Sequence, residues 1–326
     1  MNGLDPRAET MGQRLLAHLR DHYAIDPIAA TQVSVHHDHT FRVDRRDGEP
    51  WIARVFSPAR PRIGAEGDGA ILRFLERQGY PAERLATEDA VSACDGSTAL
   101  VTQFVPGGPL PMAVGREGSE KFAIMGDLLG RLHTLPCDES VNRPGGASGN
   151  DPGHEGSPGQ DLVVALGFLD AVEAKVAPGD RERFAWLRDL VRSADDASGL
   201  PEAIVHGNLL GAPDHVILGA EGPVAINWKA AGRGPRLADL AWLLWGTWAN
   251  PDWIHLAVNA YRQHVELTEE EFERLEGVML IRPLYLACFS YRRDLENGRE
   301  PQEAWAFANP EHIAAIAAAS RVAFRG

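Results

Sequence analysis

The sequence has few cysteines and no long apolar run. Only three of its 326 residues are cysteine, Cys94, Cys137 and Cys288, and no pair has CxxC spacing. Neither a disulfide framework nor a zinc site is therefore indicated. No stretch approaches the roughly 18 consecutive apolar residues of a membrane span, and the first residues lack the basic and apolar regions of a signal peptide. We expect a cytoplasmic protein without a membrane association.

Positive charge is also scarce. The chain has 32 Lys and Arg against 46 Asp and Glu, a formal net charge of −14. This excess repels nucleic acid and anionic membranes and mildly favours cationic small molecules. Hydrophobic residues at 44% and charged residues at 24% are ordinary for a globular protein, and the length suits two packed lobes or one large domain.

Several common catalytic motifs are missing. The sequence contains no GxxxxGK[ST] phosphate loop, no GxGxxG dinucleotide fingerprint, no GxSxG nucleophile elbow and no HExxH metal motif. Hydrolase and dinucleotide-binding functions therefore lose their usual support.

The hydrophobic pattern changes along the chain. Residues 7–22 and 67–78 have helical periodicity, whereas alternating residues within 31–56 and an apolar run in 97–108 predict strands. The second half is mostly helical in pattern, over 121–136, 161–175, 181–197, 239–248, 253–265, 268–296 and 309–323. A polar stretch at about 138–160 predicts a flexible surface loop. We predict an α+β chain with a β-rich N-terminal lobe over 1–104, led by a helix, and a helical lobe over 105–326.

One stretch carries the most specific motifs. It reads His-Gly-Asn-Leu at 206–209, Ile-Asn-Trp at 226–228 and Asp-Leu-Ala at 239–241. With the order of the predicted elements, it resembles the aminoglycoside phosphotransferase and choline kinase-like family, over roughly residues 30–290. Members of that family read H-G-D-L-x-x-x-N, then I-D-W or I-D-F, then D-L-A. The resemblance implies a protein-kinase-like fold of two lobes, the smaller with an antiparallel sheet and the larger mostly helical.

The resemblance also assigns catalytic roles. The family's first Asp positions or deprotonates the substrate hydroxyl, and its Asn and second Asp hold the Mg²⁺ ions that bridge the phosphates of ATP. Asn208 and Asn227 occupy the two Asp positions here. An amide cannot act as a base at neutral pH, and it is a poorer Mg²⁺ ligand than a carboxylate.

The loop between these motifs also departs from the family pattern. It is about two residues longer, so the metal-binding Asn position falls near Pro213, Asp214 and His215. We treat Asn227, Asp214 and His215 as the candidate metal ligands, the last two from a relocated position.

Two further residues complete the candidate catalytic loop, His206 and Asp239. In the family, the Asp239 carboxylate hydrogen-bonds the backbone of the His-Gly loop and so supports the site. From local sequence alone, Asp239 is equally well explained as an acid in the first turn of a helix.

The nucleotide site predicted by the resemblance lies in the N-terminal lobe. Arg54, at the end of a predicted strand, takes the position that anchors the ATP phosphates, and Asp68 on the next helix would orient it, with Glu66 as a substitute. Residues Gln103, Phe104 and Val105 would meet the adenine edge through backbone groups. The alternatives are an exposed arginine and a core strand that ends in a turn.

Other candidate residues have simpler explanations. His37 and His39 would share one strand face, but surface histidines are more often solvated or hydrogen-bonded than metal-bound. Tryptophans at 242, 245 and 248 have the spacing of a packed helix face. A substrate cavity, if present, is expected between the lobes, lined by residues such as Trp242, Tyr285 and Tyr291.

Two functions remain at this stage. The first is a degenerate or repurposed family member that binds a small molecule, favoured as cationic by the net charge, in the cleft between the lobes. The second is an active ATP-dependent O-phosphotransferase for an antibiotic or metabolite, with relocated metal ligands. ATP and Mg²⁺ are cofactors only in the second. No nucleic-acid partner is expected, and the sequence does not indicate an oligomeric state.

Overall fold

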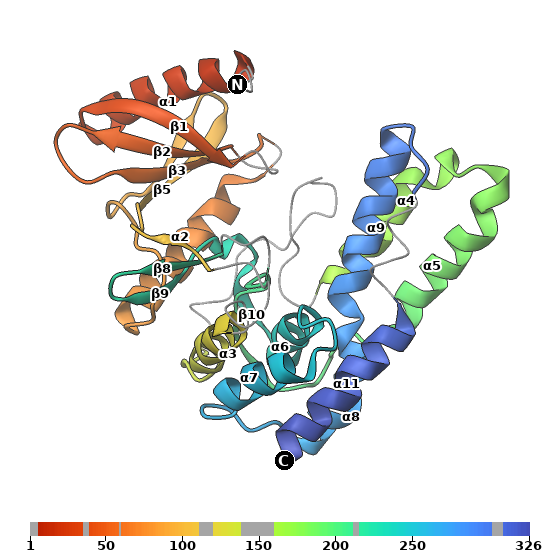
Figure 1. Cartoon of the computed structure of the whole chain (residues 1–326). Coiled ribbons are helices and arrows are strands. Elements are labelled where there is room, and N and C mark those ends of the chain that lie inside the picture. Colours follow the sequence, from red (N-terminus) through yellow and green to blue (C-terminus); the bar gives the residue numbers. More distant parts are fainter. Residues whose placement is uncertain are drawn as a thin grey trace.

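The computed structural model describes residues 6–34, 39–58, 60–110, 120–137, 160–210, 215–301 and 309–326. A strand-rich lobe formed by the first part of the chain lies beside a larger helical lobe (Figure 1). The predicted α+β architecture of two lobes is therefore confirmed.

The N-terminal lobe is built on one antiparallel sheet of five strands, in the order β1-β2-β3-β5-β4. The strands are β1 (Pro27–Ser34), β2 (His39–Arg45), β3 (Trp51–Val55), β4 (Val91–Cys94) and β5 (Ser97–Gln103). The turn between β4 and β5 is made by Asp95 and Gly96. Both have positive φ, as the two central residues of a type I′ hairpin turn require.

Two helices flank this sheet, α1 (Pro6–Tyr23) on one side and α2 (Arg62–Arg77) on the other (Figure 1). Tyr23 of α1 contacts the ring of Trp51 in an edge-on arrangement. Because successive side chains of a strand point to opposite faces, Trp51 and Val55 face α1 while Arg54 points away from it.

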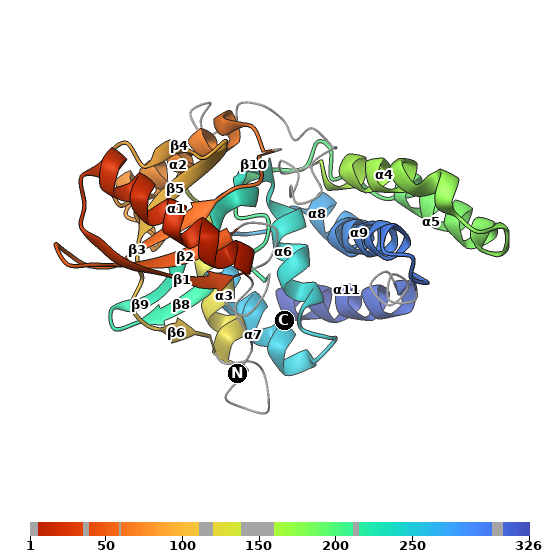
Figure 2. The same cartoon turned by 90° about the horizontal axis from the view of Figure 1, so that it is seen from above.

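The larger lobe is helical, as predicted, and its helices pack against one another in pairs. Helix α3 lies against α7, and α4 against α9; Figure 2 shows α4, α5 and α9 on the side away from the sheet. The helices are α3 (Glu120–His133), α4 (Asp161–Val172), α5 (Arg181–Ser193), α6 (Arg236–Trp245), α7 (Pro251–Tyr261), α8 (Glu269–Met279), α9 (Ile281–Glu296) and α11 (Pro310–Arg325), with short 3₁₀ turns η3 (Glu173–Lys175) and η4 (Pro178–Asp180).

The single helix predicted over 268–296 is wrong, because the structure divides it into α8 and α9 at Leu280. Pro283 is the third residue of α9 and has no N–H to donate to a carbonyl one turn earlier. At the start of a helix this costs nothing, so the chain ends one helix and begins another there.

Short strands link the two lobes and carry the predicted motifs. β7 (Glu202–Val205) pairs with β10 (Gly232–Pro235), and β6 (Gly108–Pro109), β8 (Val216–Gly219) and β9 (Gly222–Ala225) form a second small sheet. The His206 loop follows β7, and Asn227 follows β9 before the 3₁₀ turn η5 (Trp228–Ala230). Of the described helices, none is both long and apolar enough to cross a membrane.

Candidate functional site

The His-Gly loop is held by Asp239, as expected from the family. Both oxygens of the buried Asp239 carboxylate accept backbone hydrogen bonds, from His206 N at 2.7 Å and Gly207 N at 3.1 Å. Gly207 has a φ of 77°, and a Cβ atom there would lie 2.6 Å from the Ala230 carbonyl oxygen. The loop can therefore adopt this conformation only with glycine at that position.

A second layer of buried side chains lies beneath Asp239. The His133 ring is hydrogen-bonded to the Tyr261 hydroxyl at 2.9 Å, and its Nε2 lies 3.6 Å from the Asp239 carboxylate. Burial alone would raise the pKa of Asp239, but the neighbouring His133 ring and the hydrogen bond from the His206 backbone offset this, so its pKa lies below the usual value. Asp239 is thus a fixed anion that supports the loop.

The His206 side chain also has a structural position. Its Nδ1 accepts a hydrogen bond from Asn208 N at 3.3 Å, and its Nε2 donates to the Ile226 carbonyl at 3.0 Å. The ring also packs on Trp228 with centroids 4.5 Å apart. His206 therefore joins the loop that carries Asn208 to the turn that carries Asn227.

His215 joins the two asparagines directly. Its Nδ1 lies 2.7 Å from the Asn208 backbone oxygen, and its Nε2 lies 2.7 Å from Asn227 Nδ2. A carbonyl can only accept, so Nδ1 carries the proton and Nε2 of a neutral ring must accept from the Asn227 amide. These partners assign a neutral tautomer to His215, which is 9% exposed. Sequence reasoning placed His215 near the metal position but did not anticipate this bridge.

These donors do not fit a magnesium ion. Mg²⁺ prefers one or two carboxylates, and the three bridged residues offer only amide and imidazole groups, with the His215 Nε2 already used. No group of three or more His, Cys, Asp or Glu side chains within the described parts of the chain could hold a metal. Asp214, the third predicted ligand, lies outside the described residues.

Arg54 is paired with a different acid from the predicted one. Its Nη2 lies 3.0 and 2.8 Å from the two carboxylate oxygens of Glu83, in the segment after α2. Asp68 instead accepts a hydrogen bond from Arg60 at 2.8 Å, and Glu66 pairs with Arg62 on the surface. The expectation that Asp68 or Glu66 orients Arg54 is wrong, because the chain places Glu83 at the Arg54 guanidinium.

Glu83 connects the two lobes through one buried carboxylate. Besides Arg54 it accepts from the Thr102 hydroxyl at 3.0 Å and from the Asn227 backbone N at 2.7 Å. The Glu83 side chain is 2% exposed. These contacts occupy the acceptor positions of the carboxylate and tie β3 and β5 to the turn after β9. Nothing in the sequence around Glu83 distinguishes it from a surface acid, so it was missed.

The predicted adenine-binding residues lie where the N-terminal sheet joins β6. Gln103 N donates to the Arg84 carbonyl at 2.8 Å, and Phe104 N donates to the Pro50 carbonyl at 3.1 Å. The Phe104 ring lies under the Arg42 guanidinium, 4.5 Å from it, and Val105 is half-buried. Those two N–H groups are used within the protein, and adenine binding by this segment stays a prediction.

The aromatic residues of the helical lobe are divided between core and surface. Trp242 and Trp245 stack 4.8 Å apart and are buried, as the helical spacing predicts, whereas Trp248 is 63% exposed. The Arg282 guanidinium lies 4.6 Å from the Tyr285 ring and 6.0 Å from Trp242. A cation of the protein itself therefore occupies the faces of two residues that we expected to line a substrate cavity. Tyr291, the third, is buried against Phe184.

The histidines that invited a metal interpretation are only partly described. His37 lies outside the described residues, and the His39 ring is hydrogen-bonded to Gln32 at 3.0 Å.

Comparisons with known proteins agree with this arrangement. The sequence model of the phosphotransferase enzyme family matches residues 29–276, most of the chain. The chain belongs to this family. No curated protein matches the sequence significantly.

Solved structures of family members share the fold. The amicoumacin kinase hAmiN is 12% identical, with 97% of this chain and 96% of that one covered at a TM-score of 0.64. Choline kinase LicA from Streptococcus pneumoniae is 12% identical, with 94% and 98% covered at a TM-score of 0.62. A microcompartment-associated aminopropanol kinase is 15% identical, with 94% and 96% covered at a TM-score of 0.62. At these identities the likeness establishes the fold alone.

Proposed function

We propose that this phosphotransferase-family protein binds a small molecule in the cleft between its lobes without transferring phosphate. The hydrogen-bonded chain Asn208–His215–Asn227 carries the proposal. Uncharged amides stand where the family has a base and a metal-binding carboxylate, and the His215 ring bonds the Asn208 backbone carbonyl and the Asn227 side-chain amide. Phosphoryl transfer depends on positioning and on stabilising charge, and this chain supplies neither a base nor an anion there.

The Arg54–Glu83 pair is compatible with either function. Glu83 holds the predicted phosphate anchor in a buried ion pair and accepts a hydrogen bond from the Asn227 backbone. In kinases an acid that pairs with the phosphate-anchoring cation is part of the active arrangement, so this pair is not evidence against nucleotide binding.

The proposed ligand is a small polar molecule. The named neighbours are kinases of an antibiotic, of choline and of aminopropanol, which suggests a related metabolite or antibiotic and a role in resistance or biosynthesis. The Arg282 guanidinium over Tyr285 disfavours a second cation at that position, so we favour a neutral ligand over the cationic one suggested by net charge alone.

An active phosphotransferase remains the second candidate, favoured by the intact support of the His-Gly loop by Asp239. It would be an O-phosphotransferase that binds ATP and Mg²⁺, and its anionic ligand would have to come from elsewhere, such as Asp214.

The double variant Asn208→Asp with Asn227→Asp tests the proposal. We expect no gain of Mg²⁺-dependent ATP turnover, because the His215 ring would remain against position 227 and would bond the carboxylate introduced there in place of a metal. ADP formation should be measured with and without a panel of hydroxylated amines and aminoglycosides. A triple variant that adds His215→Asn is the matched comparison. Robust turnover by the double variant would show that the His215 contact does not block a metal site, and substrate-dependent ADP formation by the wild type would refute the proposal.

A further inference from the structure

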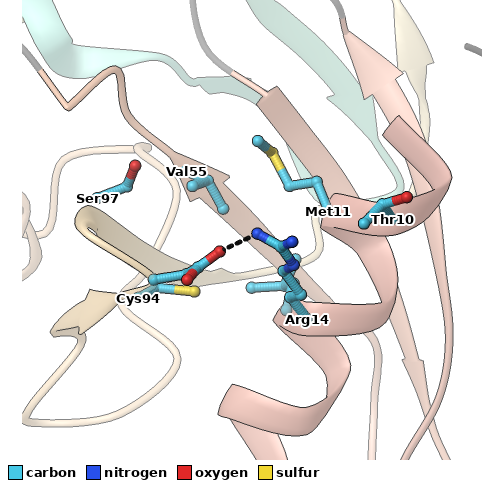
Figure 3. A pocket seen from close by; sticks show the side chains of 8 residues that line it. Thr10, Met11, Arg14, Val55, Cys94 and Ser97 are labelled. Atoms are coloured by element: carbon cyan, nitrogen blue, oxygen red, sulfur yellow. Dashed lines mark hydrogen bonds and ion pairs between the residues drawn. The ribbon is translucent and has the colours of Figure 1, made fainter. Parts of the chain in front are cut away.

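A cavity of 430 Å³ lies outside the cleft, between α1 and the end of the N-terminal sheet (Figure 3). Its volume falls within the range of pockets that bind small molecules. One wall comes from α1, and the other from β3 and the turn between β4 and β5. The residues that line it belong to none of the motifs considered above.

The inner wall of the cavity is apolar. Met11 and Leu15 of α1 face Val55 of β3 across it, and the Cys94 thiol adds a polarizable surface. Burial, and to a smaller extent the neighbouring Asp95 carboxylate, raises the pKa of Cys94, so this thiol is uncharged at neutral pH. The wall therefore suits a hydrocarbon body.

The rim is polar and without net charge. Arg14 and Asp95 form an ion pair from opposite walls, with side chains 62% and 59% exposed, so each neutralises the other. The Thr10 and Ser97 hydroxyls also line the cavity (Figure 3) and are groups that hydrogen-bond an uncharged polar end. A charged ligand would have to break the ion pair to gain a partner.

We infer that this cavity is a second ligand site, for a small uncharged molecule with an apolar body and one hydrogen-bonding end. The site is on the reverse side of the strand that carries Arg54, because Val55 points into the cavity and Arg54 toward Glu83. A ligand there would contact β3 without entering the cleft. The inference does not rest on the function proposed for the cleft and holds whether or not the protein binds ATP.

Cys94 provides a local reporter for the test. Site-resolved mass spectrometry at pH 8.5 would follow alkylation of Cys94 by N-ethylmaleimide, with half-buried Cys137 as the internal reference. Three six-carbon probes would be compared: hexan-1-ol, hexanoate and hexylammonium. We expect hexan-1-ol at about 10 mM to slow the alkylation of Cys94 about fivefold or more, as occupancy of a millimolar site requires, and to leave Cys137 unchanged.

A blocking variant and a matched control complete the test. Ser97→Phe places a large ring at the rim and should abolish protection by hexan-1-ol, whereas Ser193→Phe on exposed α5 should retain it. The inference is overturned if none of the three probes protects Cys94 in the wild type. It is also overturned if either charged probe protects better than the alcohol. These wild-type results do not depend on whether Ser97→Phe folds.

Discussion

Glu83→Gln is expected to lower the free energy of unfolding by about 3 kcal/mol, the loss typical of a buried ion pair that loses one partner. The substitution keeps the size of the side chain but leaves the Arg54 guanidinium, 9% exposed, without its counter-ion. It also replaces the carboxylate that accepts hydrogen bonds from the Asn227 backbone N and the Thr102 hydroxyl with a weaker acceptor. Urea unfolding of the two proteins would measure the difference.

Glu66→Gln is the matched control for this prediction. Glu66 pairs with Arg62 at the surface, with side chains about half exposed, and such pairs contribute roughly 0 to 1 kcal/mol. The double variant Arg54→Met with Glu83→Gln should recover part of the lost stability, because it removes the uncompensated cation. An equal, small loss for Glu83→Gln and Glu66→Gln would show that Glu83 does not tie the lobes together.

Asn227→Asp is expected to change the protonation state of His215. In the wild type the ring carries one proton, on Nδ1, because Nε2 accepts from the Asn227 amide. A carboxylate at that position can only accept, and an opposite charge at this distance shifts a histidine titration by about one to three pH units. At pH 7.5 we expect ¹⁵N NMR spectra to show one protonated ring nitrogen in the wild type and two in the variant.

Asn227→Ala is the control for the histidine experiment. It removes the amide without adding charge, so His215 should keep a single ring proton. If Asn227→Asp left the ring neutral, the new carboxylate would be directed elsewhere and would be available to a metal. That result would favour the phosphotransferase alternative.

Most of the fold could be predicted from the sequence, because helices and hairpins are encoded by patterns among neighbouring residues. Helical periodicity located most helices, and the alternation of apolar and polar residues within 31–56 located the first strands. The break at Leu280 was missed because Pro283 is compatible with the first turn of a helix, so periodicity continued across it. Short strands such as β7 and β10 depend on pairing between distant segments, which local patterns do not report.

The candidate site could be predicted only in part, because many of its contacts join segments that are distant in the sequence. The support of the loop by Asp239 was implied by the family resemblance, although local sequence alone explains Asp239 equally well as an acid in the first turn of a helix. The partner of Arg54 could not be predicted in this way. Glu83 lies in the segment after α2, belongs to no recognisable motif, and meets Arg54 only because of the path that the chain takes there. The bridge made by His215 depends on how the lengthened loop folds back between two asparagines. Each of these contacts depends on where distant segments meet in three dimensions.

The measurement that tests the central claim most directly is calorimetric titration of the protein with ATP, with and without Mg²⁺. We expect that Mg²⁺ does not tighten ATP binding, because the Asn227 amide and the His215 ring at the metal position are uncharged and bonded to each other. Clear tightening by Mg²⁺ would show that an anionic metal site exists in this cleft, and it would contradict the account.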